Sequence, residues 1–300
     1  MRRWLAAASP ALARVADHPT LWIPGALAWV ASVGWIPFVV AVVRVPTQSE
    51  LTYFGAGMQT SGLWPLNLVL IAAGAVALVT LGVGLVAIGN AALDAVLRDR
   101  PFGTADAGRR FVTSLIGVTP VALVVFALLV ATIAVAPAEF NRPLSDPGPV
   151  LRTLGRLVPL LVLGAIVVVS SAALAGLAGR AAIETGSVAG GLAGLPAIVR
   201  RAGSAGGLHI AVTAVVGVAY LVLSGLLLQV LWAPIGEGWL AGGAIDATGG
   251  LLLVGFVAIW LCVVLVGGAL HAWGSAAWST ILDPRGTIAA PVRSHEAPID

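Results

Sequence analysis

The sequence contains no lysine and a single cysteine, and charged residues of either sign are scarce. Only 10% of its 300 residues are charged, whereas soluble domains carry about 25%. This scarcity excludes a water-soluble fold. The absence of lysine excludes a Walker-type phosphate-binding loop, and the HExxH and GxSxG patterns of metalloproteases and hydrolases are absent as well. We therefore predict no enzyme activity and no catalytic residue.

Metal and cofactor ligands are equally few. Cys262 lies between Leu261 and Val263, has no partner for an intramolecular disulfide, and is interpreted as a small hydrophobic residue. His209 and His271 are expected near the same membrane face, where a pair of histidines could bind a metal or titrate near neutrality. Neither has a neighbouring cysteine or acidic ligand, so we expect both to be satisfied by interfacial water. No cofactor-binding or metal-binding residue is predicted.

What the sequence does contain is a set of six long apolar stretches without a charged residue in their interiors. They cover residues 21–43, 63–88, 112–136, 157–179, 208–232 and 250–273. As helices, each would reach about 34 Å or more, enough to cross a hydrocarbon core of about 30 Å. We predict an all-α polytopic membrane bundle in which residues 1–279 form one six-helix domain. Residues 280–300 are expected to be a polar, disordered cytoplasmic tail.

The distribution of arginine predicts the orientation of these spans. All 16 basic residues are arginines, and twelve of them flank the side that would hold both termini. Positive residues favour the cytoplasmic side, so both termini are expected there, in the cytoplasmic (inner) membrane of a bacterium. A bacterial source is inferred from the richness in Ala, Val, Gly, Leu and Arg, typical of GC-rich genomes. Because the arginines are scattered beside spans, no nucleic-acid partner is predicted.

Two roles remain open for the arginines of the cytoplasmic loops. They could attract anionic lipid, or they could only set the topology, which is the simpler interpretation. The nearest acids, Asp94 and Glu184, lie beyond the predicted span ends. A transporter coupled to protons or sodium normally carries ionisable residues within the membrane. Ion coupling is therefore disfavoured.

Tryptophans and turn-forming residues predict further local features. Trp29, Trp35 and Trp260 lie deep in their spans and are expected to pack between helices. The outer segments 45–62, 137–155 and 233–249 are rich in Gly, Pro or small polar residues and are predicted to be irregular turns.

The six spans can be grouped into three similar helical hairpins. An Ala-Ala pair follows every second span, at Ala91-Ala92, Ala181-Ala182 and Ala276-Ala277. Arginines precede the odd-numbered spans, and a Gly break in the second and fourth loops is followed by a segment of helical character. Either a threefold repeat or an alanine-rich composition accounts for this pattern.

The residues Ala91-Ala92, Gly103-Thr104, Ala107 and Arg109-Arg110 also carry a resemblance, followed more loosely by residues 181–201. The chain resembles a class of uncharacterised bacterial six-span membrane proteins similar to the membrane domain of some glycerophosphodiester phosphodiesterases. The resemblance implies a helical membrane domain over nearly the whole chain. It implies no activity, because the soluble barrel of that family would need about two hundred further residues.

Small residues supply the candidate contact surface with partners. Ala172, Ala175, Gly176 and Gly179 form small-xxx-small pairs that allow helices to approach closely in lipid. Packing within the chain is the default use of this face, and contact with other membrane proteins is the alternative. Besides the lipid bilayer, no other partner is predicted.

Two functions fit these observations. The first is a scaffold or accessory subunit of a membrane assembly, without a catalytic site. The alternative is a permease-like transporter component whose energising partner would dock on residues 93–110 or 183–203.

Overall fold

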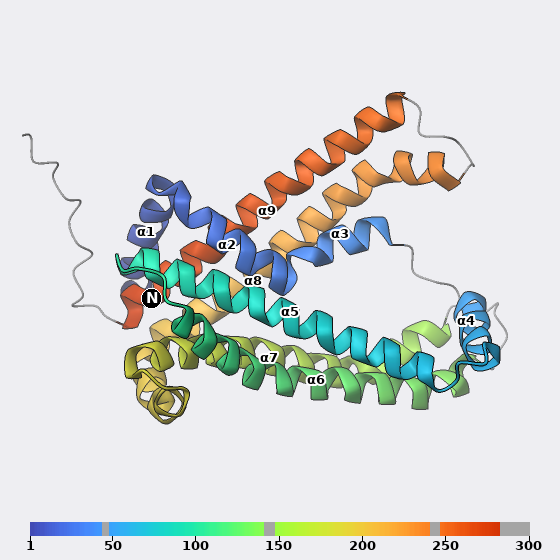
Figure 1. Cartoon of the computed structure of the whole chain (residues 1–300), viewed down its shortest axis with the longest axis horizontal. Coiled ribbons are helices and arrows are strands. Elements are labelled where there is room, and N and C mark those ends of the chain that lie inside the picture. Colours follow the sequence, from blue (N-terminus) through green and yellow to red (C-terminus); the bar gives the residue numbers. More distant parts are fainter. Residues whose placement is uncertain (44–47, 141–147, 241–246, 283–300) are drawn as a thin grey trace, which may run out of the picture.

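The computed structural model describes residues 1–43, 48–140, 148–240 and 247–282, which are helical and contain no strand (Figure 1). The helices are α1 (Arg2–Asp17), α2 (Trp22–Trp29), α3 (Trp35–Val42), α4 (Gln48–Thr60), α5 (Leu66–Leu97), α6 (Thr104–Phe140), α7 (Gly148–Thr185), α8 (Val188–Leu240) and α9 (Ala247–Leu282). A 3₁₀ turn, Pro19–Leu21, precedes α2, and a π-helical turn, Val30–Gly34, joins α2 to α3.

Six helical segments of the described chain are long and apolar enough to cross a membrane. They are Pro19–Val42, Val69–Leu97, Thr104–Ala127, Val158–Thr185, Val188–Trp239 and Ala247–Leu282. Each segment overlaps one of the six stretches expected from hydropathy, although the bounds differ, and the predicted all-α fold is confirmed. The chain is a multi-pass helical membrane protein.

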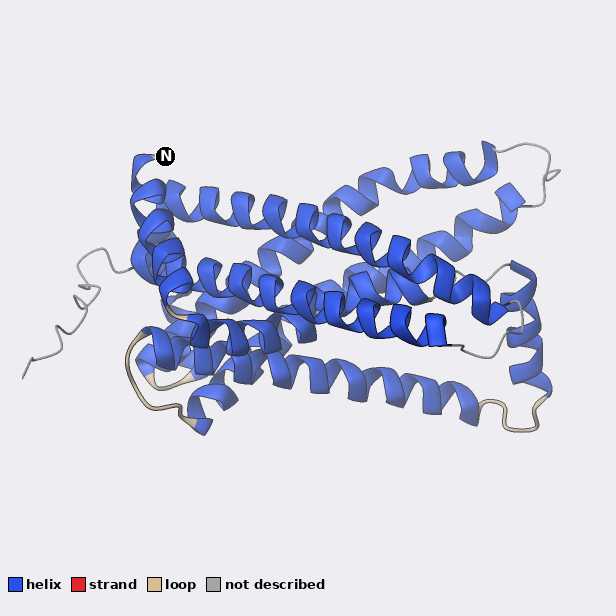
Figure 2. Ribbon diagram, turned by 90° about the horizontal axis from the view of Figure 1, so that it is seen from above, coloured by secondary structure: helices blue, strands red, loops and turns tan. Residues whose placement is uncertain are grey.

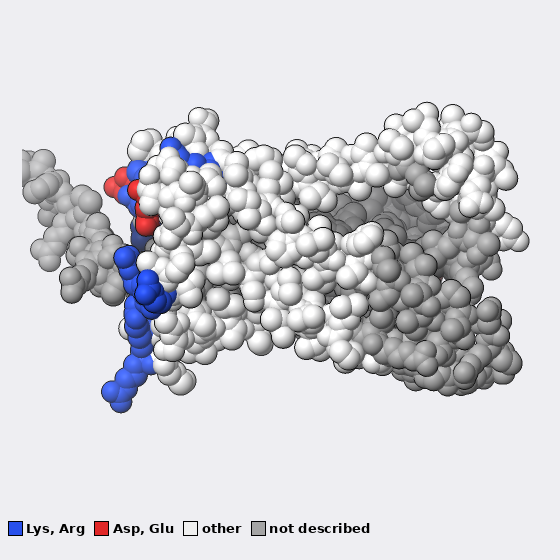
Figure 3. Space-filling view, turned by 90° about the horizontal axis from the view of Figure 1, so that it is seen from below, with Lys and Arg blue, Asp and Glu red and all other residues white. Residues whose placement is uncertain are grey.

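The long helices run lengthwise beside one another, and shorter helices lie across the two ends of the bundle (Figures 1 and 2). α1 crosses one end and α4 the other. On the face seen in Figure 3, the charged side chains of the described residues gather at the end that carries α1. The arginine-rich loops are therefore collected at one end of the molecule.

The first span is a helix interrupted by the π-helical turn, where Trp29 packs inward. The Trp29 ring covers Gly34 and Gly267, and its centroid lies 5.7 Å from that of Tyr220. Its predicted packing role is confirmed. Trp260 likewise packs on Phe38, with ring centroids 5.4 Å apart.

Trp35 departs from the prediction, because 50% of its surface is exposed. Its indole donates only to the carbonyl of Ser32 in the preceding turn. Cys262 is exposed on α9 as well. Depth along a span therefore did not predict which face of the helix a residue occupies.

The outer segments are more helical than predicted. α4 occupies most of residues 45–62, α6 continues to Phe140, and α8 continues to Leu240. Hydropathy marks only the part of a helix that suits hydrocarbon, whereas backbone hydrogen bonding continues until the chain turns. The prediction of irregular turns is therefore wrong over these stretches. Residues 45–47, 141–147 and 241–246, within or beside the predicted turns, lie outside the described residues.

The two Gly-containing loops at the α1 end differ from each other. In the fourth loop, Gly203 has φ 53° and ψ −145° and separates a short helix from the rest of α8. This backbone conformation is accessible essentially to glycine alone. In the second loop, the helix that begins at Thr104 continues unbroken through the whole of α6. α9 ends at Leu282, and residues 283–300 of the predicted tail lie outside the described residues.

Packing at the α1 end is close because small side chains meet there. Ala11, Leu93 and Ala277 belong to one buried cluster that joins α1, α5 and α9. All but Ala92 of the six residues in the predicted Ala-Ala pairs are buried, from 0% to 4% exposed. Gly268 lies directly against the backbone of α2 at Trp22 and Ala26. Small residues thus bring the spans together at this level.

Candidate ligand-binding site

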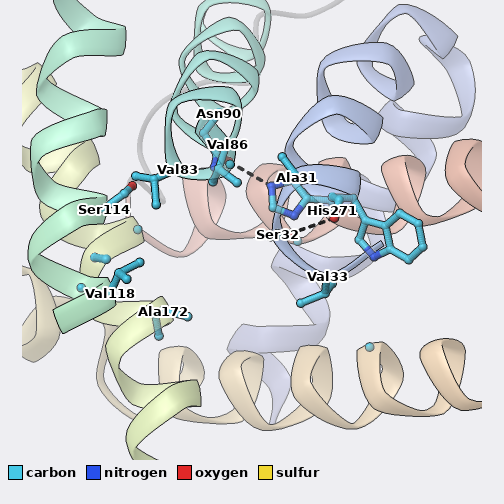
Figure 4. A pocket seen from close by; sticks show the side chains of 18 of the residues that line it. Ala31, Ser32, Val33, Val83, Val86, Asn90, Ser114, Val118, Ala172 and His271 are labelled. Carbon is cyan, nitrogen blue, oxygen red and sulfur yellow. Dashed lines mark hydrogen bonds between the residues drawn. The ribbon is translucent and has the colours of Figure 1, made fainter. Parts of the chain in front are cut away.

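A large cavity lies between the spans, with a volume of about 1250 Å³. We call it the interhelical cavity. It is lined by residues of α2, the π-helical turn, α3, α5, α6, α7, α8 and α9. Apolar side chains such as Val83, Val86 and Val118 form much of its wall (Figure 4). Pockets for drug-sized ligands span about 300–1,000 Å³, so this cavity suits a larger molecule.

One region of the cavity wall is polar. Asn90, Arg110, Arg180, His209 and His271 all line it. They come from five different helices, α5 to α9. The cavity therefore combines an apolar wall with a patch of charged and hydrogen-bonding groups.

At the centre of this polar region lies a buried ionic group, the arginine–aspartate cluster of Asp94, Arg110 and Arg180. Arg110 Nη2 donates to Asp94 Oδ2, and Arg180 Nη2 lies 3.6 Å from Asp94 Oδ1. The side chains of Asp94, Arg110 and Arg180 are 2%, 5% and 5% exposed. Buried charges require partners, and one carboxylate here faces two guanidinium groups.

Backbone and hydroxyl groups complete part of the arginine coordination. Arg110 Nη1 donates to the carbonyl of Gly176 at 3.2 Å. Arg180 donates to the carbonyl of Ser275 at 2.8 Å and to the Ser279 hydroxyl at 3.0 Å. Arg110 Nε is buried and has no hydrogen-bond partner among the described residues. Both arginines are thus bonded through both terminal nitrogens, and the Nε of Arg110 is the donor left without a described partner.

The local sequence explains how Arg110 reaches this position. A Cβ on Gly179 would lie 3.0 Å from Arg110 Cδ and 3.0 Å from Thr113 Oγ1. Glycine at 179 therefore lets the Arg110 side chain lie flat against α7. One turn along, Gly117 packs on Ala175 in the same way.

These positions correct two sequence-based expectations. Asp94 lies within α5, which continues to Leu97, and not beyond the end of its helix. Arg110 and Arg180, interpreted as topology signals or lipid-facing groups, are buried between helices. Glu184 also lies within its helix, α7, which continues to Thr185, but it remains exposed and pairs with Arg98 at 2.9 Å.

The two histidines have protein partners where interfacial water was expected. His209 is 0% exposed: its Nε2 donates to the Gly274 carbonyl at 3.0 Å, and its Nδ1 accepts from Trp4 Nε1 at 3.3 Å. His271 Nε2 donates to Asn90 Oδ1 at 2.9 Å (Figure 4). Among the described residues, no group of three or more His, Cys, Asp or Glu side chains could hold a metal ion.

The residues of the predicted small-residue face lie in two environments, the contact with α6 and the wall of the interhelical cavity. Ala175 and Gly179 pack against α6 inside the chain, and Ala175 also lines the interhelical cavity. Ala172 and Gly176 line the interhelical cavity, and a Cβ on Gly176 would meet nothing within 4 Å. Half of this face therefore serves internal packing, as the default interpretation expected.

Sequence reasoning missed the arginine–aspartate cluster, although a signal was present. Arg110, Thr113 and Gly117 recur at the i, i+3, i+7 spacing of one helix face, which is the face that meets α7. The adjacent Arg109 points elsewhere and pairs with Asp106 at 2.8 Å. Of two neighbouring arginines, the helical period thus selects the one that is buried.

No protein-family model, curated protein or solved structure matches the chain. The resemblance to the membrane domain of glycerophosphodiester phosphodiesterases therefore stays a prediction.

Proposed function

We propose that this membrane protein binds an amphipathic, lipid-like molecule in its interhelical cavity, as the permease-like component of a membrane assembly. The observation that carries the proposal is the cavity of about 1250 Å³, apolar along much of its wall and charged in one region. A protein that only packs against neighbours needs no such space, because helix interiors are normally filled.

The polar groups of the cavity support the proposed binding function. These groups are arginines, amides, hydroxyls and hydrogen-bonded histidines, which orient a ligand without supplying a nucleophile–base pair. Movement of a ligand would require energy from elsewhere, because the sequence has no nucleotide-binding motif. We place the docking site of such a partner at the α1 end, where the loops after α5 and α7 lie, and assign that end to the bacterial cytoplasm.

A scaffold or accessory role is the second candidate. Ala172 and Gly176 leave a strip of small residues uncovered in the cavity wall. A helix from a partner protein could pack there, because small residues allow close approach in lipid.

Purification in a mild detergent followed by native mass spectrometry separates the two candidates. The binding function predicts a co-purified lipid, whose occupancy falls about tenfold in Ala172→Phe because the new ring fills the cavity. Ala165→Phe is the matched control, since Ala165 is exposed on the same helix and does not line the cavity. A stoichiometric partner protein lost in Ala172→Phe, with no lipid bound to the wild type, would instead support the scaffold.

A further inference from the structure

We propose that Arg110, supported by Arg180, is the subsite for the phosphate headgroup of an anionic phospholipid whose acyl chains lie along the apolar cavity wall. This subsite presupposes the ligand-binding function proposed above and adds the charge and chemical class of the ligand.

The first step is the charge balance of the arginine–aspartate cluster. Asp94 is the single acidic partner that the described residues provide for both Arg110 and Arg180. All three side chains are at least nine-tenths buried. An excess positive charge is costly away from water unless an anion neutralises it. The cluster therefore carries one excess positive charge, which one further negative charge would neutralise.

The second step is the donor that remains free in the cluster. Arg110 and Arg180 both line the interhelical cavity. Both arginines already donate through both terminal nitrogens, Arg110 to Gly176 and Asp94 and Arg180 to Ser275 and Ser279. Arg110 retains a buried Nε without a described partner. Guanidinium groups bind phosphate oxygens through charge-assisted hydrogen bonds, which identifies Arg110 as the principal contact.

The third step is the wall beyond the cluster. Ser114 lies one turn after Arg110 and lines the same wall of α6, followed by Val118 after another turn (Figure 4). Asn90 and Val86 repeat this polar-to-apolar order on α5. A free phosphate would leave the apolar surface uncovered, whereas a phospholipid matches both regions. Free phosphate and a phospholipid would bind Arg110 through the same phosphate group. The change from polar to apolar residues along α5 and α6 favours the phospholipid.

The position along the bundle agrees with a headgroup. The cluster joins the ends of α5, α6 and α7 at the α1 end, where the exposed Arg98–Glu184 pair and the partly buried Arg100–Asp106 pair also lie. Charged side chains of membrane proteins concentrate at headgroup depth, because burying them in hydrocarbon is expensive. A lipid bound here would keep its phosphate near the level of its neighbours in the bilayer.

The test reconstitutes the full-length protein in nanodiscs containing equal amounts of phosphatidylglycerol and phosphatidylcholine, and measures the retained lipids by native mass spectrometry. Both lipids carry a phosphate, but only phosphatidylglycerol lacks a cation that cancels it, so the wild type is expected to retain the anionic lipid about tenfold over the zwitterionic one. Arg110→Met should reduce this preference to near unity. Arg200→Met is the control, because Arg200 is an exposed arginine that donates to Pro196 on its own helix.

Arg110→Met leaves Asp94 paired with Arg180, so a folded variant is expected by size-exclusion chromatography. If it fails to fold, Arg110→Lys replaces it: the charge remains but the flat guanidinium is lost, and the preference should fall about threefold. An unchanged lipid ratio in the variant that folds would overturn the subsite. Stabilisation by inorganic phosphate in phosphatidylcholine discs, equal to that by phosphatidylglycerol, would assign the site to free anions and overturn the lipid assignment.

Failure of the subsite differs from failure of the proposed function. If lipid is retained and Ala172→Phe removes it, but headgroup charge has no influence, only the subsite is wrong. If the wild type retains neither lipid and Ala172→Phe has no effect, the ligand-binding function itself is wrong.

Discussion

Arg180 on α7 donates a hydrogen bond of 2.8 Å to the backbone carbonyl of Ser275 on α9, 95 positions further along the chain. The same guanidinium pairs with Asp94 on α5. One side chain thus joins three helices that are not consecutive. This arrangement makes the arginine–aspartate cluster a structural junction as well as the charged region of the cavity.

Asp94→Asn removes the carboxylate that pairs with both arginines. Breaking a buried ion pair leaves uncompensated charge, so we expect the free energy of unfolding to fall by about 3–5 kcal/mol. Reversible unfolding in mixed micelles measures the change. Glu184→Gln is the control, because Glu184 is 48% exposed in its pair with Arg98, and its loss should cost less than about 1 kcal/mol. Equal effects of the two substitutions would contradict the buried position of Asp94.

Gly268→Ala tests the close contact between α9 and α2. The added methyl group would lie 2.5 Å from Ala26 N and 2.6 Å from the Trp22 carbonyl oxygen. We expect a loss of about 1–3 kcal/mol from overpacking, measured by thermal or denaturant unfolding. Gly255→Ala on the same helix is the control, since its Cβ would meet nothing within 4 Å. That variant should be neutral or stabilised by up to about 1 kcal/mol, because alanine favours helix.

Trp4→Phe tests how α1 is held across the end of the bundle. The substitution keeps an aromatic ring but removes the donor to Nδ1 of fully buried His209. Leaving that acceptor unsatisfied should cost about 1–3 kcal/mol, seen as faster hydrogen exchange in residues 2–17. Trp35→Phe should leave exchange in α1 unchanged, because Trp35 bonds only to its own helix. Uniform acceleration along the whole chain would argue against a local role.

Reporter fusions test the orientation of the bundle. A reporter after Asp300 should be active only in its cytoplasmic form, as the arginine distribution predicts. A reporter inserted after Ser61, between α4 and α5, should be active only in its periplasmic form. The reverse pair of activities would invert the topology and place the arginine–aspartate cluster at the outer face.

The sequence sufficed to predict the six spans, because charge-free stretches longer than a bilayer have few other stable environments. It did not place Arg110 and Arg180. Hydropathy treats an arginine as the end of a span, although the helix continues around it. Which of Arg109 and Arg110 is buried depends on helix rotation, since neighbouring residues point about 100° apart.

The interhelical cavity could not be predicted from the sequence at all. Its wall combines Asn90 of α5, Ser114 of α6 and His271 of α9, whose proximity depends on how the helices cross. Each of these residues alone looks like an isolated polar side chain near a span end. Only the packing of small residues, such as Gly117 on Ala175, determines where the helices meet and where they leave space.

The contacts of α1 impose an order on synthesis. Arg3 donates to the carbonyls of Arg201 and Ile281, and Trp273 donates to that of Ala8, so α1 has partners in α8 and α9 as well as in α5, where Arg14 donates to the Leu97 carbonyl. α1 leaves the ribosome long before α8 or α9. Its contacts with α8 and α9 can form only after α9 has been inserted. Docking of α1 against α8 and α9 is therefore a late step of biogenesis, which closes this end of the bundle only after α9 has been made.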